Sequence, residues 1–200
     1  MFKSIKSIGA AVFAGALMAS SAFADGIAGA PAPFDSRPVK LAVVSFLGGG
    51  DWLQAFEAGV KRQADALGVE LTISQARNDN DTQRSLVEQA INLGVDGIII
   101  NNGRPEVLKD VAQKALDAGI QVVAYDVDLD NPKIPQIEQS DRDMATLTLE
   151  QAIKDKGEGF TGGAVYVAGF APLDRRYAVW KEFVEKHNLT EKAVWGVVND

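Results

Sequence analysis

The sequence predicts an α/β fold in which a parallel sheet is flanked by helices. Three units follow residue 38, and each has a short apolar run, a polar loop and a helical stretch. Each unit ends on a glycine that leads straight into the next apolar run, at Gly68, Gly94 and Gly119. A glycine at such a joint can take the left-handed conformation that ends a helix. Strands that alternate with helices need crossover connections, which build a parallel sheet.

The first two units indicate where strands and helices begin. Residues 39–46 and 69–74 are rich in apolar and β-branched side chains, as strands are. Asp51 and Asp81 stand near the start of the helical stretches and are expected to cap them. Helical spacing then predicts which side chains face the core: Trp52, Ala55, Phe56 and Val60 in the first helix, and Leu86, Val87, Ala90 and Leu93 in the second.

The third unit leads into a fourth strand. Residues 95–100 predict a strand whose apolar second half fits burial on both faces. Pro105 suits the first turn of the following helix, because a helix makes no use of the N–H group there. The expected core face of that helix and the next strand are Val107, Leu108, Val111, Ala115 and Leu116, and residues 120–125.

The regular pattern stops after Ile137 and restarts as what we expect to be a second lobe. Helices are predicted at residues 144–153 and 174–187, and strands at residues 163–168 and 193–198. We therefore expect four parts: a signal peptide (1–24), an extended leader (25–37), lobe 1 (38–139) and the incomplete start of lobe 2 (140–200).

The first residues have the features of a secretory signal peptide. Lys3 and Lys6 precede an apolar stretch at residues 8–19, which is short for a membrane-spanning helix. Ala22-Phe23-Ala24 then supplies the small residues that signal peptidase reads. A membrane anchor is the alternative, but no long stop-transfer stretch follows. We expect cleavage before Asp25, a periplasmic location, and an extended leader because its prolines disfavour a helix.

Composition argues against several classes of function. The 200 residues carry a net charge of −7 without a basic cluster, so neither nucleic acid nor an anionic membrane is an expected partner. The chain has no cysteine, and its single histidine, His187, stands near the end of a predicted helix. A Ser–His arrangement would depend on that one residue. Catalysis therefore has little support, and we expect a monomer that is not an enzyme.

Two loops match cofactor-binding motifs only in part. Gly48-Gly49-Gly50-Asp51 joins a strand to a helix, where phosphate can bind, but it lacks the dinucleotide and P-loop patterns. Residues 126–131 begin like a calcium-binding loop, but Asn131 and Ile137 stand where that loop needs Gly and Glu. We therefore expect neither a metal ion nor a cofactor.

Polar side chains follow the predicted strands, at the edge of the sheet where open α/β folds bind ligands. Trp52 offers a flat aromatic face to a sugar ring, with packing in the core as the alternative. Asp126, Asn101 and Asn102 offer carboxylate and amide groups that can bind several hydroxyls at once. A solvated turn is the alternative for Asp126.

Four stretches carry a family resemblance. They are KLAVVS (residues 40–45), GVDGIIIN (94–101), AGIQVVAYD (118–126) and Ser140-Asp141. Over residues 39–200 the chain resembles the ribose-type substrate-binding proteins of ABC sugar importers, which have the two-lobed type I periplasmic binding fold. Regulators of the lactose-repressor type share the middle motifs, but the signal peptide argues against a DNA-bound protein.

The resemblance implies roles for individual residues. Trp52 falls on the aromatic residue that stacks on the sugar, with Leu53 beside it, and Asp126 falls on the aspartate that binds hydroxyls from lobe 1. Arg176 falls on an arginine contributed by lobe 2, with a solvated helix residue as the alternative. Three departures from the ribose pattern imply a different pentose, a hexose or a linear polyol as the ligand: Gly50, Leu53 and Val127.

The resemblance also implies a mechanism. A receptor of this family closes two lobes around a monosaccharide or polyol and delivers it to the permease of an ABC importer, without chemistry. Two alternatives stay open: an exported α/β glycan hydrolase, and a type I sensor for a signalling molecule or amino acid. Because family members are longer, we expect residues 25–200 alone to lack part of lobe 2 and to bind no sugar with micromolar affinity.

Overall fold

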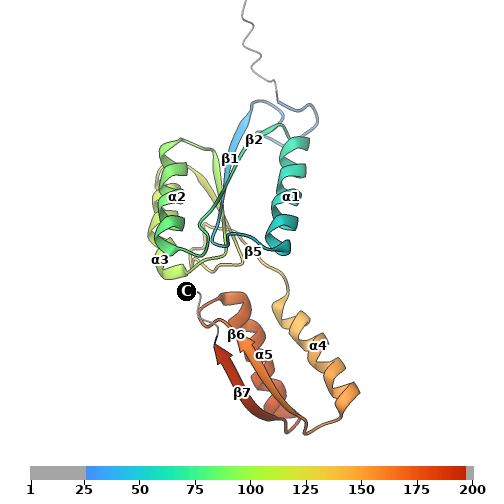
Figure 1. Ribbon diagram of the computed structural model, residues 1–200. Coiled ribbons are helices and arrows are strands. Elements are labelled where there is room, and N and C mark those ends of the chain that lie inside the picture. The colour runs from blue at the N-terminus through green and yellow to red at the C-terminus, as the bar shows by residue number, and fades with distance from the viewer. Residues whose placement is uncertain (1–25, 197–200) are drawn as a thin grey trace, which may run out of the picture.

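The computed structural model describes residues 26–196. Within this range the chain forms two α/β lobes, and lobe 1 lies above lobe 2 in Figure 1. The expected signal peptide and the last two residues of the strand predicted at 193–198 lie outside the described range. No described helix is long and apolar enough to cross a membrane.

Lobe 1 is built on a five-stranded sheet in which all neighbouring strands are parallel. This arrangement confirms the predicted fold class. In the paired register, Asn101 lies beside Ser45 on one side and Tyr125 on the other, so three strands end level at one edge. In spatial order the strands are β2 (Val69–Gln75), β1 (Val39–Ser45), β3 (Gly97–Asn101), β4 (Gln121–Tyr125) and β5 (Gln136–Ile137).

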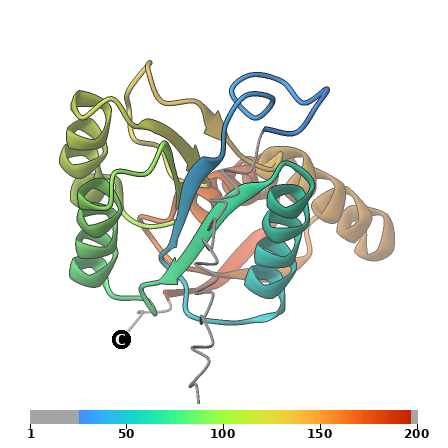
Figure 2. The ribbon, with the colours of Figure 1, turned by 90° about the horizontal axis from the view of Figure 1, so that it is seen from above.

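Helices cover both faces of this sheet. α1 (Asp51–Ala66) lies on one face, and α2 (Asn80–Asn92) and α3 (Pro105–Asp117) lie on the other (Figures 1 and 2). Buried aliphatic side chains from β1, β3, β4, α2 and α3 form the main core, and each contributes about 1.5–3 kcal/mol through burial. Its fully buried members include Val44, Val87, Ile98, Ile100, Leu108, Val111 and Val122.

The joints between helices and strands agree with the prediction. Gly68, Gly94 and Gly119 have φ values of 60°, 64° and 81°, in the left-handed region that other residues rarely adopt. Each helix can therefore end at its glycine joint, and the next strand begins one to three residues after the glycine. Pro105 is the first residue of α3, as expected.

The helix starts differ from the prediction. Asp51 is the first residue of α1 and does not cap it, because Gly50 occupies the N-cap position. Asp79, not Asp81, caps α2, and its Oδ1 accepts the backbone N–H of Thr82 at 2.6 Å. The polar run before α2 holds several residues that can cap a helix, so sequence alone does not single one out.

The buried faces of α1 and α2 were also predicted only in part. α1 buries Leu53 and Ala64, whereas Trp52 and Ala55 are exposed. Leu93 is 71% exposed, because α2 ends one residue before it and the chain turns away. The apolar residues of α1 offer two adjacent stripes, and the sheet takes the one that contains Leu53.

Lobe 2 pairs two strands beside two helices. Its core contains Val179, Trp180 and Phe183 from α5. Both helices begin three residues earlier than predicted, because their first turns are polar or contain proline and carry no apolar periodicity. The elements are α4 (Asp141–Lys156), β6 (Thr161–Tyr166), α5 (Ala171–Lys186) and β7 (Thr190–Gly196), and β6 pairs with β7 in parallel.

Residues 26–37 form turns rather than the expected extended leader. The backbone N–H of Ile27 donates to the carbonyl of Phe34 at 2.7 Å, which closes the segment into a loop. Prolines exclude a helix here, but they fit the early positions of turns equally well. Arg37 then binds Asp96 with both Nη atoms, at 3.0 and 2.7 Å, and this bond holds the pKa of Asp96 below its usual value.

Candidate ligand-binding site

A pocket of about 280 Å³ lies between the two lobes. Lobe 1 contributes residues from the loops after β1, β3 and β4, and lobe 2 contributes the segment from the end of β6 into α5. The pocket therefore lies beyond the carboxyl ends of parallel strands, where this class of sheet binds ligands. The lining residues are Leu47, Trp52, Asn102, Asp126, Gln139, Val167, Phe170, Pro172, Leu173 and Arg176.

Asn102 and Asp126 directly follow β3 and β4, and both have left-handed backbones. Their φ values are 55° and 53°, which is uncommon for residues with a side chain. The backbone N–H of Asn102 donates to the carbonyl of Tyr125 at 2.8 Å, and that of Asp126 donates to Ile137 at 3.0 Å. The sheet thus holds both residues in conformations that cost free energy, as often happens at functional sites.

α2 supports Asn102 from behind. Gln83 is fully buried, and its Nε2 donates to the carbonyl of Asn102 at 3.0 Å. Gly103 makes this contact possible, because a Cβ at that position would lie 2.3 Å from Oε1 of Gln83. Gln83 is therefore a positioning residue that the sequence analysis did not identify.

The polar atoms at this edge are buried and incompletely bonded. Asp126 is 3% exposed and Asn102 is 6% exposed. Within residues 26–196, Oδ1 of each side chain has no hydrogen-bond partner. A buried oxygen without a partner costs about 1–3 kcal/mol. Asn80, Gln83 and Asn101 each hold such an atom too, but of these residues only Asp126 and Asn102 line the pocket.

The pKa of Asp126 also indicates that its carboxyl group lacks hydrogen-bond donors. Burial raises the pKa of its carboxyl group, and the nearby charge of Asp141 raises it further. Arg175, the backbone N–H of Gln139 and Arg176 act in the opposite direction without cancelling the shift. The carboxylate is therefore short of donors, which is the state that a hydroxyl-bearing ligand would relieve.

Two arginines of α5 converge on one buried carboxylate. Asp141 is 1% exposed at the start of α4. Arg175 donates Nε and Nη2 to its Oδ2 at 3.1 and 2.7 Å, and Arg176 donates Nε to its Oδ1 at 2.7 Å. Arg175 also pairs with Glu138, just after β5, at 3.1 Å. These bonds fix Arg176 at the pocket wall.

Trp52 lies at the rim of the pocket rather than in the core. It is 39% exposed. Its ring stacks on Phe56, with centroids 5.6 Å apart and an interplanar angle of 9°, and it lies 6.0 Å from the ring of Tyr125. Neighbouring aromatic rings therefore hold Trp52 in place while part of its surface stays open.

Three of the predicted site residues do not line the pocket. Asn101 is fully buried, and its Nδ2 donates to Oγ of Ser45 at 3.0 Å, so it serves the sheet. Leu53 is 1% exposed, because it stands one residue along α1 from Trp52 and faces the sheet. Gly50 caps α1 with a φ of 93°. The structure thus brings together Trp52, Asn102, Asp126 and Arg176.

Phe170 and Gln139 line the pocket but were missed from the sequence. The ring of Phe170 lies 5.4 Å from that of Phe46, and the guanidinium of Arg104 stands 5.9 Å from its centroid. The rule that ligands lie at carboxyl ends, applied to lobe 2, would have found Phe170. No local sequence pattern marks Gln139, because it reaches the pocket through the pairing of the short strand β5 with β4.

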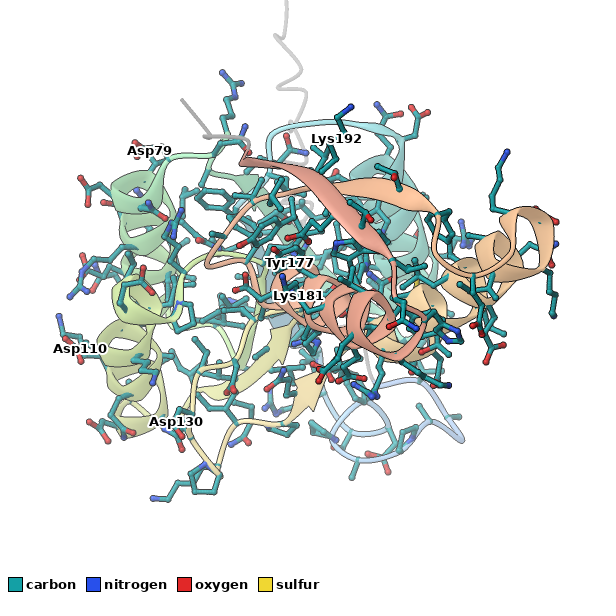
Figure 3. All side chains as sticks on the ribbon, turned by 90° about the horizontal axis from the view of Figure 1, so that it is seen from below. Asp79, Asp110, Asp130, Tyr177, Lys181 and Lys192 are labelled. Atoms are coloured by element: carbon teal, nitrogen blue, oxygen red, sulfur yellow. The ribbon has the colours of Figure 1, made fainter. Side chains whose placement is uncertain are left out.

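Of the residues that begin like a calcium-binding loop, Asp126 lines the pocket and Asp130 does not. Asp130 pairs with Lys109 at 3.2 Å, and in Figure 3 it lies with Asp110 at the periphery, away from Tyr177 and Lys181 on α5. Across residues 26–196 there is no cluster of three or more acidic or histidine side chains that could hold a metal ion. His187 ends α5 with Nδ1 3.2 Å from Glu158.

The described residues form two α/β lobes with a pocket between them, and comparison with known families places this fold. Residues 41–191 match the family described as "Periplasmic binding protein domain". The chain belongs to this family, which confirms the resemblance to ribose-type periplasmic binding proteins.

Individual relatives are binding proteins for small polyhydroxylated compounds. The D-xylose-binding periplasmic protein of Escherichia coli is 31% identical over 88 residues, 38% of this chain and 27% of its own length. A xylitol-binding protein of Mycolicibacterium smegmatis is 32% identical over 56% of this chain and 32% of its own. The 5-methylthioribose transporter solute binding protein of Thermotoga lettingae, crystallised with 5-methylthioribose, is 35% identical with a TM-score of 0.75.

The match to these relatives is partial in length. The similarity to the Thermotoga lettingae structure covers 80% of this chain and 51% of that one. The chain thus spans about half the length of the solved structure and between a quarter and a third of these two curated relatives.

Proposed function

We propose that this protein is the periplasmic receptor of an ABC importer for a monosaccharide or a short polyol. It binds the ligand between its lobes and passes it unchanged to the permease. The ligands named for the relatives support a small polyhydroxylated compound, and they make D-xylose, xylitol and 5-methylthioribose the first to test. The signal peptide expected at residues 1–24 supports a periplasmic location.

The observation that carries this proposal is the buried pair formed by Asp126 and Asn102. A carboxylate can accept hydrogen bonds from two adjacent hydroxyls, and the amide beside it can both donate and accept. Each Oδ1 has no partner within residues 26–196. Sugar hydroxyls are therefore the ligand groups that fit this edge of the pocket.

Lobe 2 completes the site from the opposite side. Arg176 lines the pocket while its Nε is bonded to Asp141, which leaves the outer end of the guanidinium to donate to ligand oxygens. A ligand that bonds to Asp126 in lobe 1 and Arg176 in lobe 2 stabilises the closed arrangement of the lobes.

The carboxylates of the site favour binding over hydrolysis. A glycosidase needs two carboxyl groups that flank the scissile bond. Among the described residues that line the pocket, Asp126 supplies the one carboxyl group. Asp141 is close enough to affect its pKa, but it is 1% exposed and bonded to two arginines.

The proposal is tested on protein purified from the periplasm of its host. A thermal-shift screen of D-xylose, ribose, xylitol, 5-methylthioribose and the amino acids selects ligands, calorimetry measures their affinity, and mass spectrometry identifies the recovered compound. For the protein as it occurs in the periplasm we expect saturable binding of one sugar or polyol per chain and its recovery unchanged. Residues 25–200 produced alone are the control, which should bind no sugar with micromolar affinity. Hydrolysis of glycosides, or binding of amino acids alone, would overturn the proposal.

A further inference from the structure

We infer that the ligand carries an apolar substituent at one end, opposite the hydroxyls that bind Asp126. This inference rests on the proposed function, because it describes the ligand of the same pocket. It follows from the order in which polar and apolar residues line the two lobes.

The lining changes in polarity along the edge of the lobe 1 sheet. The strands lie in the order β1, β3, β4, β5, and the segment after each contributes to the pocket. Leu47 follows β1, Asn102 follows β3, Asp126 follows β4 and Gln139 follows β5. The wall therefore passes from aliphatic at β1 to amide at β3, carboxylate at β4 and amide at β5.

Lobe 2 shows the same direction of change. Phe170 contacts Phe46, the residue that follows β1, so its ring lies at the apolar end. Arg176 is bonded to Asp141, which stands just after β5, so its guanidinium lies at the polar end. Both walls of the pocket thus place their apolar groups on the same side.

Trp52 links the two ends. Its ring lies 6.0 Å from that of Tyr125, which ends β4, although the residue itself follows β1. Its open face therefore suits the C–H face of a sugar ring in the middle of the pocket. The apolar end beyond it includes Leu47 and Phe170, and Val167 and Pro172 line the pocket from the same segment of lobe 2 as Phe170.

The physical consequence is selection against a hydroxyl at the β1 end. A hydroxyl there gives up its bonds to water and meets aliphatic and aromatic side chains, whereas an alkyl or thioether group gains by leaving water. The volume of about 280 Å³ is near the lower end of known ligand pockets, which suits a monosaccharide with a short substituent.

The test compares ligands that differ at one end only. In their furanose forms ribose, 5-deoxyribose and 5-methylthioribose share the ring hydroxyls and differ at carbon 5, so the affinity for ribose is expressed per concentration of its furanose form. Calorimetry on the periplasmic protein should show that 5-methylthioribose binds at least ~10-fold tighter than ribose, because a buried methylthio group replaces a hydroxyl. We expect 5-deoxyribose to bind no weaker than ribose.

Variants assign the preference to the apolar end. Leu47→Asn places an amide at the apolar end. It should lower the ratio of the affinity for 5-methylthioribose to the affinity for ribose by about threefold or more. Val167→Thr, which adds a hydroxyl at constant volume, should lower it too if Leu47→Asn does not fold. Leu93→Asn is the matched control, because Leu93 is 71% exposed at the end of α2, and it should leave the ratio unchanged.

The outcomes separate this inference from the proposed function. Equal or tighter binding of ribose, or a ratio that Leu47→Asn leaves unchanged, would overturn the inference while the receptor function stands. If no sugar or polyol bound, whether substituted or not, both would fail. A ratio above tenfold that falls in Leu47→Asn and persists in Leu93→Asn supports the inference.

Discussion

Asp126 combines three features that cost free energy in the folded protein and that a bound hydroxyl could partly offset. Its backbone is left-handed, its side chain is 3% exposed, and its Oδ1 lacks a partner within residues 26–196. Each of these features costs free energy in the unliganded protein. The raised pKa has the same origin, because burial and Asp141 disfavour the charged carboxylate.

Replacing Asp126 should therefore separate binding from stability. Asp126→Asn keeps the shape and removes the charge, so calorimetry should show an affinity for the sugar about tenfold lower or more. Because the folded-state pKa of this acid is raised, its charge destabilises the fold at neutral pH, and this effect fades as the pH falls through that pKa. At neutral pH the free energy of unfolding of Asp126→Asn should thus equal or exceed that of the wild type.

The same carboxyl group predicts how binding depends on pH. Affinity should fall as the pH is lowered through the raised pKa of Asp126, that is, above the ordinary value of about 3.9 for an aspartate. Titrations at a series of pH values measure the midpoint, and the dependence should disappear in Asp126→Asn. A variant that binds as tightly as the wild type would return Asp126 to the role of a turn residue.

Trp52 gives a second test at the residue scale. Trp52→Ala should weaken sugar binding by ~1–3 kcal/mol, because a large aromatic contact is lost. The free energy of unfolding of the variant should change by much less than the ~3–5 kcal/mol lost when a buried aromatic side chain is removed, since Trp52 is 39% exposed. Trp180→Ala, in the core of lobe 2 and 7% exposed, is the matched control for that larger loss. A core-sized loss for Trp52→Ala with unchanged affinity would contradict the stacking role.

At the scale of elements, the order of strands and helices could be predicted and several helix starts could not. Apolar runs and the glycines Gly68, Gly94 and Gly119 reflect strong local constraints, because a left-handed joint excludes most other residues. The start of α2 lies within a polar run that holds Asp79 and Asp81, and both residues can cap a helix. Tertiary packing decides between such equivalent positions, and one sequence does not reveal it.

The cap of α2 can be tested with these two aspartates. Asp79→Ala removes the acceptor for the backbone N–H of Thr82, so chemical denaturation should show a lower free energy of unfolding. Asp81→Ala changes an exposed residue in the first turn of the helix and should have a smaller effect. The cap assignment is wrong if Asp81→Ala destabilises the protein more than Asp79→Ala does.

Candidate site residues were predictable where one element determines their position. Trp52, Asn102 and Asp126 stand at the carboxyl ends of β1, β3 and β4, and the alternation of strands and helices is enough to place them there. Phe170 and Gln139 reach the pocket only through the way lobe 2 and β5 pack against lobe 1. Such residues depend on contacts that are distant in sequence and leave no local pattern.

At the scale of the whole molecule, the pocket belongs to neither lobe alone. Asp126 and Asn102 line the pocket from lobe 1, and Arg176 and Phe170 line it from lobe 2. The lobes already touch through Phe46 and Phe170, next to Arg104. A ligand that fills the space between these walls links the lobes through hydrogen bonds to both, which is the basis of hinge closure in two-lobed receptors.

The location of the protein is a separate prediction at this scale. The small residues Ala22 and Ala24 should direct cleavage, so the mature chain should begin at Asp25. Intact mass spectrometry of protein from the periplasmic fraction measures this directly, with the cytoplasmic fraction as control. Mature protein that retains Met1 would remove the support that export gives to a transport function.

The central claim is that one small ligand is bound by both lobes at once, and amide hydrogen exchange tests it most directly. Exchange is measured on the periplasmic protein with and without saturating 5-methylthioribose, and with ribose in parallel. We predict slower exchange in both lobes, at residues 102–103 and 126–129 of lobe 1 and at residues 167–176 of lobe 2. Protection confined to one lobe, or no protection at concentrations that saturate binding, would contradict the account.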